Sequence, residues 1–230
     1  MLENLFNKIN NAVESYNSEM ETIDTKVKQE LKENAVPGVP FSDEQVAKIK
    51  ENKKSEFDEM LTDKVAQSLN EFESNVSKNI EELQQQLNPE GFQEEKNSQT
   101  NRAANKVSML KPEQIPGYLN NIENKAEREE FISYAKIKLS DKPALQKELS
   151  QQIINSMSEE EKSTRQQLAK NKSLLDNLGY FNNKTYDAAD KIITGDNPIK
   201  NEPINNLNNS FGDRNKEIEN KVDRLILEQF

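Results

Sequence analysis

The sequence predicts an all-α protein with a long antiparallel, coiled-coil-like helical hairpin and a smaller bundle of short helices. Three observations predict this class. Apolar residues recur at steps of three or four over long stretches. Only 6 glycines and 8 prolines occur among 230 residues. The mean hydropathy is −0.99 and 33% of the residues are hydrophobic, so thin helical packing is favoured over a thick globular core.

The longest predicted helix begins after Ser42 and ends before Pro89. Ser42 and Gln45 have the spacing of a capping box, and Pro89 disfavours the α conformation at Asn88. The apolar stripe between them averages roughly 3.7 residues per step, typical of a nearly straight pairing, over about 67 Å. So narrow a stripe needs a partner helix. Its members are Val46, Ile49, Phe57, Leu61, Val65, Leu69, Phe72, Val76, Ile80, Leu83 and Leu87.

A second apolar stripe predicts a first helix over residues 2–34. A turn rich in proline and glycine, residues 34–40, separates the two helices, so an antiparallel hairpin is expected. The first helix is shorter by about ten residues, so the end of the second stripe overhangs. The rest of the chain or a second subunit must cover this overhang. Its residues are interface candidates: Phe72, Val76, Ile80, Leu83 and Leu87.

The domain boundaries follow from changes in composition. We expect the hairpin at 1–88, a polar linker at 89–99 and a C-terminal helical domain at 100–230. Within that domain, short helices are expected at 100–110, at 118–139, from Pro143 and after a capping box at Ser158. Gly179 is expected to stop the last of these, an asparagine-rich loop is expected near 194–212, and Asp213 is expected to cap a final helix.

The predicted final helix carries more apolar side chains than one helix face needs. Leu225, Ile226 and Phe230 are therefore further interface candidates. They have two interpretations: docking onto the core of the same domain, or anchoring in a groove of a partner protein.

Composition argues against several function classes. The net charge is −10, with 31 basic and 41 acidic residues interleaved, which disfavours nucleic acid as a partner. The absence of Cys and His removes thiolate chemistry and the commonest general base and metal ligand. No apolar run reaches the roughly 18 residues of a membrane span. No phosphate-binding glycine loop occurs.

The acidic residues Asp187, Asp190 and Asp196 could suggest a cation site. Their spacing does not match a calcium-binding loop, so they are interpreted as carboxylates of a helix surface and a turn. We predict no catalytic, cofactor-binding or metal-ligating residue, and no cofactor.

The favoured function is therefore that of a non-enzymatic helical interaction or structural protein, such as an assembly or scaffold component. Its partner would be another protein or a second copy of the chain. Abundant Asn, Lys and Ile suggest an AT-rich bacterial or phage genome, and the cytoplasm is the expected compartment. Two alternatives stay open: a secreted bacterial effector or adaptor that binds a host protein, and an enzyme that uses carboxylates, Lys or Tyr.

Overall fold

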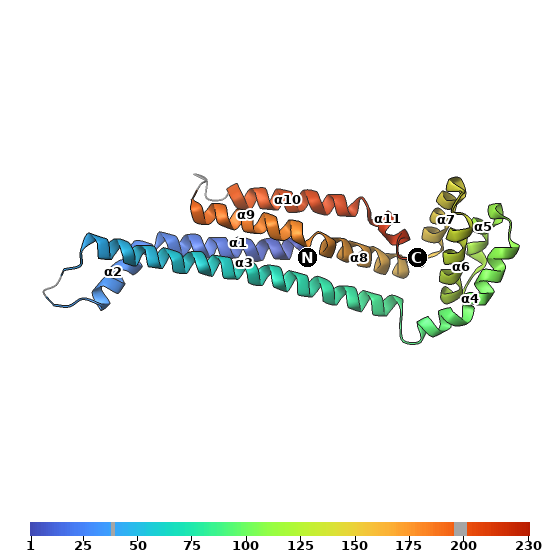
Figure 1. Ribbon diagram of the computed structural model, residues 1–230, viewed down its shortest axis with the longest axis horizontal. Helices are drawn as coiled ribbons and strands as arrows, with labels where there is room; N and C mark the ends of the chain where they lie inside the picture. Colours follow the sequence, from blue (N-terminus) through green and yellow to red (C-terminus); the bar gives the residue numbers. More distant parts are fainter. Residues whose placement is uncertain (38–39, 196–201) are drawn as a thin grey trace. The chain divides into compact units, whose positions relative to one another are not determined.

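The computed structural model describes residues 1–37, 40–195 and 202–230 (Figure 1). The predicted all-α class is confirmed, since the described residues form helices and turns and include no strand. None of the helices in these ranges combines the length and the apolar character that crossing a membrane requires. The chain forms two compact units, which are described separately.

The first unit comprises Met1–Val76 and Leu175–Lys216. It contains α1 (Leu2–Glu21), α2 (Ile23–Glu33) and most of α3 (Asp43–Leu87), with a break at Thr22 in the predicted first helix. Polar contacts join α1 and α2 to α3, and they show that the paired helices are antiparallel (Figure 1). The coiled-coil character of this pairing stays a prediction. These contacts pair Lys8 with Glu71, Ser15 with Lys64, Tyr16 with Asp58, Asp24 with Lys50, and Glu30 with Lys53.

Both ends of α3 lie where the sequence predicts them. The Ser42 hydroxyl accepts a hydrogen bond from the Gln45 amide at 3.2 Å, and the Gln45 side chain accepts one from the Ser42 amide at 2.8 Å. The helix ends at Leu87, directly before Asn88 and Pro89. The 45-residue helix is therefore delimited by local signals, a reciprocal cap and a proline.

Helices α9 (Leu178–Thr194) and α10 (Glu202–Glu219), the latter up to Lys216, complete the first unit. Phe181 of α9 is fully buried, with its ring edge-to-face against Phe72 of α3 at 6.1 Å and Phe211 of α10 at 5.1 Å. Aromatic pairs prefer this geometry. One aromatic cluster thus joins the consecutive helices α9 and α10 to α3, which is distant from them in sequence.

The second unit comprises Ser77–Leu174 and Glu217–Phe230. Its core is a cluster of buried residues from several short helices, including Phe131, Ile132, Ile153 and Ile226. Polar pairs Glu95–Asn124, Thr100–Glu130 and Val107–Lys138 show that α4 and α6 run parallel. The elements wholly within it are α4 (Phe92–Met109), η1 (Pro112–Gln114), α5 (Ile115–Tyr118), η2 (Leu119–Asn121), α6 (Lys125–Lys138), α7 (Pro143–Ser156) and α11 (Val222–Leu227); α8 (Glu159–Asp176) belongs to it up to Leu174.

The predicted linker at 89–99 is mostly helical, because α4 already begins at Phe92. The Gln, Glu and Lys residues of this segment have good helix propensity. Phe92, in the first turn of α4, is buried and so stabilises the start of the helix. The predicted single helix at 118–139 is instead divided into α5, η2 and α6. The division into a hairpin at 1–88, a linker at 89–99 and a helical domain at 100–230 stays a prediction.

The prediction of a loop near 194–212 is wrong from residue 202 onward, because α10 occupies Glu202–Glu219. Residues 196–201 of the predicted loop lie outside the described ranges. Buried Ile204, Leu207, Phe211 and Ile218 form a helical stripe within the asparagine-rich run. Asp213 accordingly lies inside α10 and does not cap a final helix.

Gly179 does not stop a helix. Helix α8 ends at Asp176 and α9 begins at Leu178, so Gly179 lies in the first turn of α9. Positive φ occurs among the described residues at Gly91 and Gly195, which flank α4 and α9. The stop signal of α9 is therefore Gly195, in the left-handed conformation.

Candidate functional site

The predicted interface residues of α3 are all buried within the single chain. Exposed fractions are 9% or less, so the overhang is covered without a second copy. Partner binding through these side chains would require the helices to separate, and their role in an interface stays a prediction. The residues are Phe72, Val76, Ile80, Leu83 and Leu87.

The predicted interface residues near the end of the chain also contact the core of their own unit. Ile226 is fully buried in it, while Leu225 and Phe230 are half-buried and pack against it. This arrangement corresponds to the first of the two interpretations, docking onto the same domain. It leaves the second untested, since a docked segment can also be released.

A buried group of charged side chains, which we call the Arg165 network, lies in the second unit. Arg165 is 4% exposed and pairs with Glu129 at 2.5 Å and Glu161 at 3.0 Å. Arg128 pairs with Glu161 at 2.6 Å, and Lys96 lies 3.2 Å from Glu129. Buried Glu129 and partly buried Glu161 therefore each have two cationic partners, which offsets the cost of removing these carboxylates from water.

A second buried carboxylate, Glu127 of α6, is paired with cations of α4. It is 4% exposed, pairs with Lys106, and lies 3.5 Å from Arg102. Its backbone amide is capped by the Asn124 side chain at 2.7 Å. Sequence reasoning missed these residues, because alternating charges along a helix are typical of a solvated surface.

Helix α11 and the residues after it cover the Arg165 network. The Cζ atom of the Arg165 guanidinium lies 4.1 Å from the centroid of the Phe230 ring. The Gln229 side chain donates a 3.0 Å hydrogen bond to the Arg165 carbonyl. Lys136 donates to the Leu227 carbonyl at 2.6 Å, and burial lowers the pKa of its ammonium. This short segment is thus attached to the unit by apolar, cation–π and polar contacts together.

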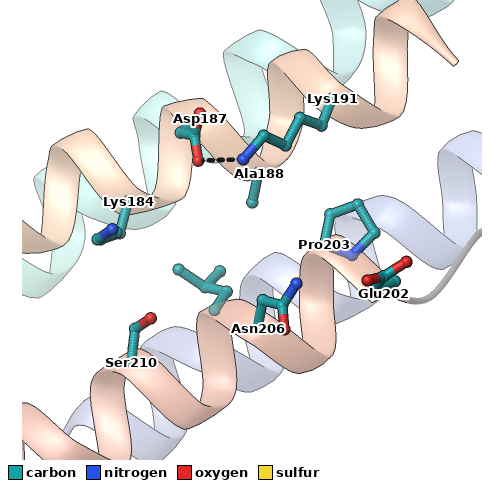
Figure 2. A pocket seen from close by; sticks show the side chains of 9 residues that line it. Lys184, Asp187, Ala188, Lys191, Glu202, Pro203, Asn206 and Ser210 are labelled. Atoms are coloured by element: carbon teal, nitrogen blue, oxygen red, sulfur yellow. Dashed lines mark hydrogen bonds and ion pairs between the residues drawn. The ribbon is translucent and has the colours of Figure 1, made fainter. Parts of the chain in front are cut away.

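A pocket of about 400 Å³ lies between α9 and α10 in the first unit (Figure 2). Lys184, Asp187 and Lys191 extend from α9, and Glu202 and Asn206 face them from α10 (Figure 2). The remaining lining residues are Ala188, Pro203, Leu207 and Ser210.

The charges around this α9–α10 pocket are mixed in sign. Asp187 and Lys191 form an ion pair of 2.8 Å with both side chains about half exposed, while Lys184 and Glu202 bring opposite charges. Such a lining offers polar contacts to a ligand without a net preference for anions or cations. No sequence signal indicates this pocket, because the sequence predicts a loop where α10 lies.

Among the described carboxyl groups, Asp24 and Glu71 have pKa values below the ordinary range, and both belong to the first unit. Hydrogen bonds from Lys50 to Asp24, and from Lys8 and Gln67 to Glu71, lower the pKa of each acid. Both groups are thereby held more firmly in the ionised form. Neither is poised to donate a proton near neutral pH, as a general acid must be.

The described residues contain no group of three or more Asp or Glu side chains placed to hold a metal ion. Asp187 is paired with Lys191, and Asp190 is exposed on α9. Asp196, the third member of the acidic group considered above, lies outside the described residues.

No protein-family model, curated protein or solved structure matches this chain.

Proposed function

We propose that this chain is a non-enzymatic helical interaction protein that serves a scaffold or assembly role by binding another protein. The single observation that carries the proposal is α3, a helix of 45 residues whose apolar stripe is buried from Phe57 to Leu87. A helix of this length spans about 67 Å. Supported along its length, it is suited to hold binding surfaces at a fixed separation.

The cross-helix pairs support a stiff element. Lys8 with Glu71, Tyr16 with Asp58, and Lys50 with Asp24 occur at successive levels of the pairing. The two ion pairs are exposed and each contributes little to stability, but together with the Tyr16 hydrogen bond they favour one register over others.

The experiment is native purification of the full-length tagged chain from the cells that make it, followed by chemical cross-linking and mass spectrometry. The proposal expects a complex of defined stoichiometry with another protein, and cross-links from exposed lysines of the helices such as Lys54 and Lys78. Recovery of the free chain alone, under conditions that preserve other complexes, would contradict it.

A further inference from the structure

We propose that residues Val222–Phe230 form a latch, and that its seat on the second unit binds a short amphipathic helix of a partner protein when the latch is released. The inference rests on the proposed function in one respect, that the chain binds protein partners. It adds the location of the binding surface and the chemistry of the segment that fits there.

The seat of the latch is an apolar site with a charged rim. Ile226 inserts fully into the core cluster that contains Phe131 and Ile153. Val222, Leu225, Leu227 and Phe230 pack against that cluster while staying partly exposed. A helix that presents spaced apolar anchors to a groove is a common mode of peptide recognition.

The latch is short and much of its surface is exposed. Helix α11 has six residues, too few to persist as an isolated helix in water. Its outer side carries Asp223, Arg224 and Glu228, all exposed. The buried Oε1 atom of Gln229 has no hydrogen-bond partner among the described residues, which is an unfavourable feature of the docked state. Such a segment is expected to open before the unit unfolds.

The seat is expected to persist after the latch leaves. Arg165 donates its hydrogen bonds to Glu129 and Glu161, which belong to α6 and α8. The latch contacts the face of the guanidinium through Phe230 and the Arg165 carbonyl through Gln229. Release of the latch therefore leaves the ion pairs of Arg165 intact, so the seat is already formed for another segment.

The pairing of Arg165 also determines which side chain fits the rim. Two carboxylates already engage its N–H groups, so an acidic partner residue would be repelled by Glu129 and Glu161. The open face of the guanidinium instead attracts an aromatic ring. The seat thus fits an aliphatic residue at the position of Ile226 followed, four residues later, by an aromatic residue.

The test uses a fluorescein-labelled peptide with the sequence of residues 220–230, titrated into two full-length proteins, the wild type and Ile226→Ala. Weakening the internal latch frees the seat, so the peptide is expected to bind the variant at least about tenfold more tightly than the wild type. Replacing Phe230 by Ala in the peptide is expected to weaken binding at least about tenfold. Replacing Arg224 by Ala in the peptide is the control and should leave binding unchanged, because that side chain is 81% exposed.

Equal binding to the two proteins, or no binding to a variant that keeps its helical circular dichroism, would overturn the proposal. If the variant unfolds, hydrogen exchange on the wild type decides. The Leu225 amide, bonded to the Lys221 carbonyl, is expected to exchange at least about a hundredfold faster than buried amides of α6, and equal rates would overturn the latch. Exchange of latches between two copies, seen as a wild-type dimer, would overturn the choice of a partner protein. These outcomes do not depend on recovering a cellular partner, so this inference and the proposed function can fail separately.

Discussion

The hydroxyl of Tyr16 donates a 2.8 Å hydrogen bond to the Oδ1 atom of Asp58, joining α1 to α3 within the first unit. Tyr16 is 3% exposed. Burial, together with this hydrogen bond, raises the pKa of Tyr16 above its ordinary value of 10.0. The cause is physical: ionised Tyr16 would place a second negative charge beside Asp58 with little water to screen it.

Replacing Tyr16 by Phe is expected to change how stability depends on pH. Because the pKa is higher in the folded state, the contribution of Tyr16 is complete below the unfolded pKa of about 10 and is lost as the pH rises beyond it. The wild-type Tm should therefore fall more steeply than that of Y16F between about pH 9 and 11. Circular dichroism melts of both proteins measure this, and lysine deprotonation affects both alike. Parallel pH profiles would contradict the buried hydrogen bond.

Replacing Leu61 and Leu69 together by Lys is expected to disrupt the pairing of α1 with α3. Leu61 is fully buried and Leu69 is 4% exposed, so each substitution removes a core leucine and buries a charge. Loss of a buried leucine alone costs about 2–5 kcal/mol. Thermal melting by circular dichroism measures the loss, with exposed Glu59→Lys as the control. An unchanged Tm would show that the stripe is not buried.

Replacing Arg165 by Met is expected to destabilise the second unit by about 3–5 kcal/mol, because Glu129 and Glu161 lose a buried cation. The matched control is Lys191→Met, which breaks the exposed pair with Asp187 and should cost less than about 1 kcal/mol. Urea denaturation of the two variants gives the comparison. Similar small losses for both would mean that the network is hydrated in solution.

Treatment with EDTA is expected to leave the Tm unchanged. The described residues include no cluster of three potential ligands, and Asp187 is engaged by Lys191. Differential scanning calorimetry before and after treatment measures this. A clear decrease in Tm that is restored by one divalent cation would contradict the expectation and identify a metal.

Structural features that depend on neighbouring residues can be predicted from the sequence. The cap at Ser42 and Gln45 and the end of α3 before Pro89 depend on contacts within one helical turn or on one peptide bond. The stripe of α3 is equally clear from Phe57 to Leu87, because its period is sustained there without the polar gap at Lys53. Such features can be predicted without knowing the tertiary structure.

Features that depend on tertiary packing were missed. The asparagine-rich run was predicted as a loop from propensity, but burial of Ile204, Leu207 and Phe211 stabilises α10. The α9–α10 pocket was missed with it. In the Arg165 network, only Glu161 and Arg165 have helical i, i+4 spacing, and Glu129 joins them from another helix. Periodicity cannot distinguish such buried charges from exposed ones.

The apolar stripe of α3 is buried within a single chain from Phe57 to Leu87, so we expect partner proteins to bind elsewhere. Light scattering coupled to size-exclusion chromatography of the full-length protein measures whether copies associate. We expect one species at the monomer mass of 26.4 kDa across the concentration series. A defined dimer at low micromolar concentration, dissociated by Leu83→Lys, would show instead that the stripe is an interface between copies.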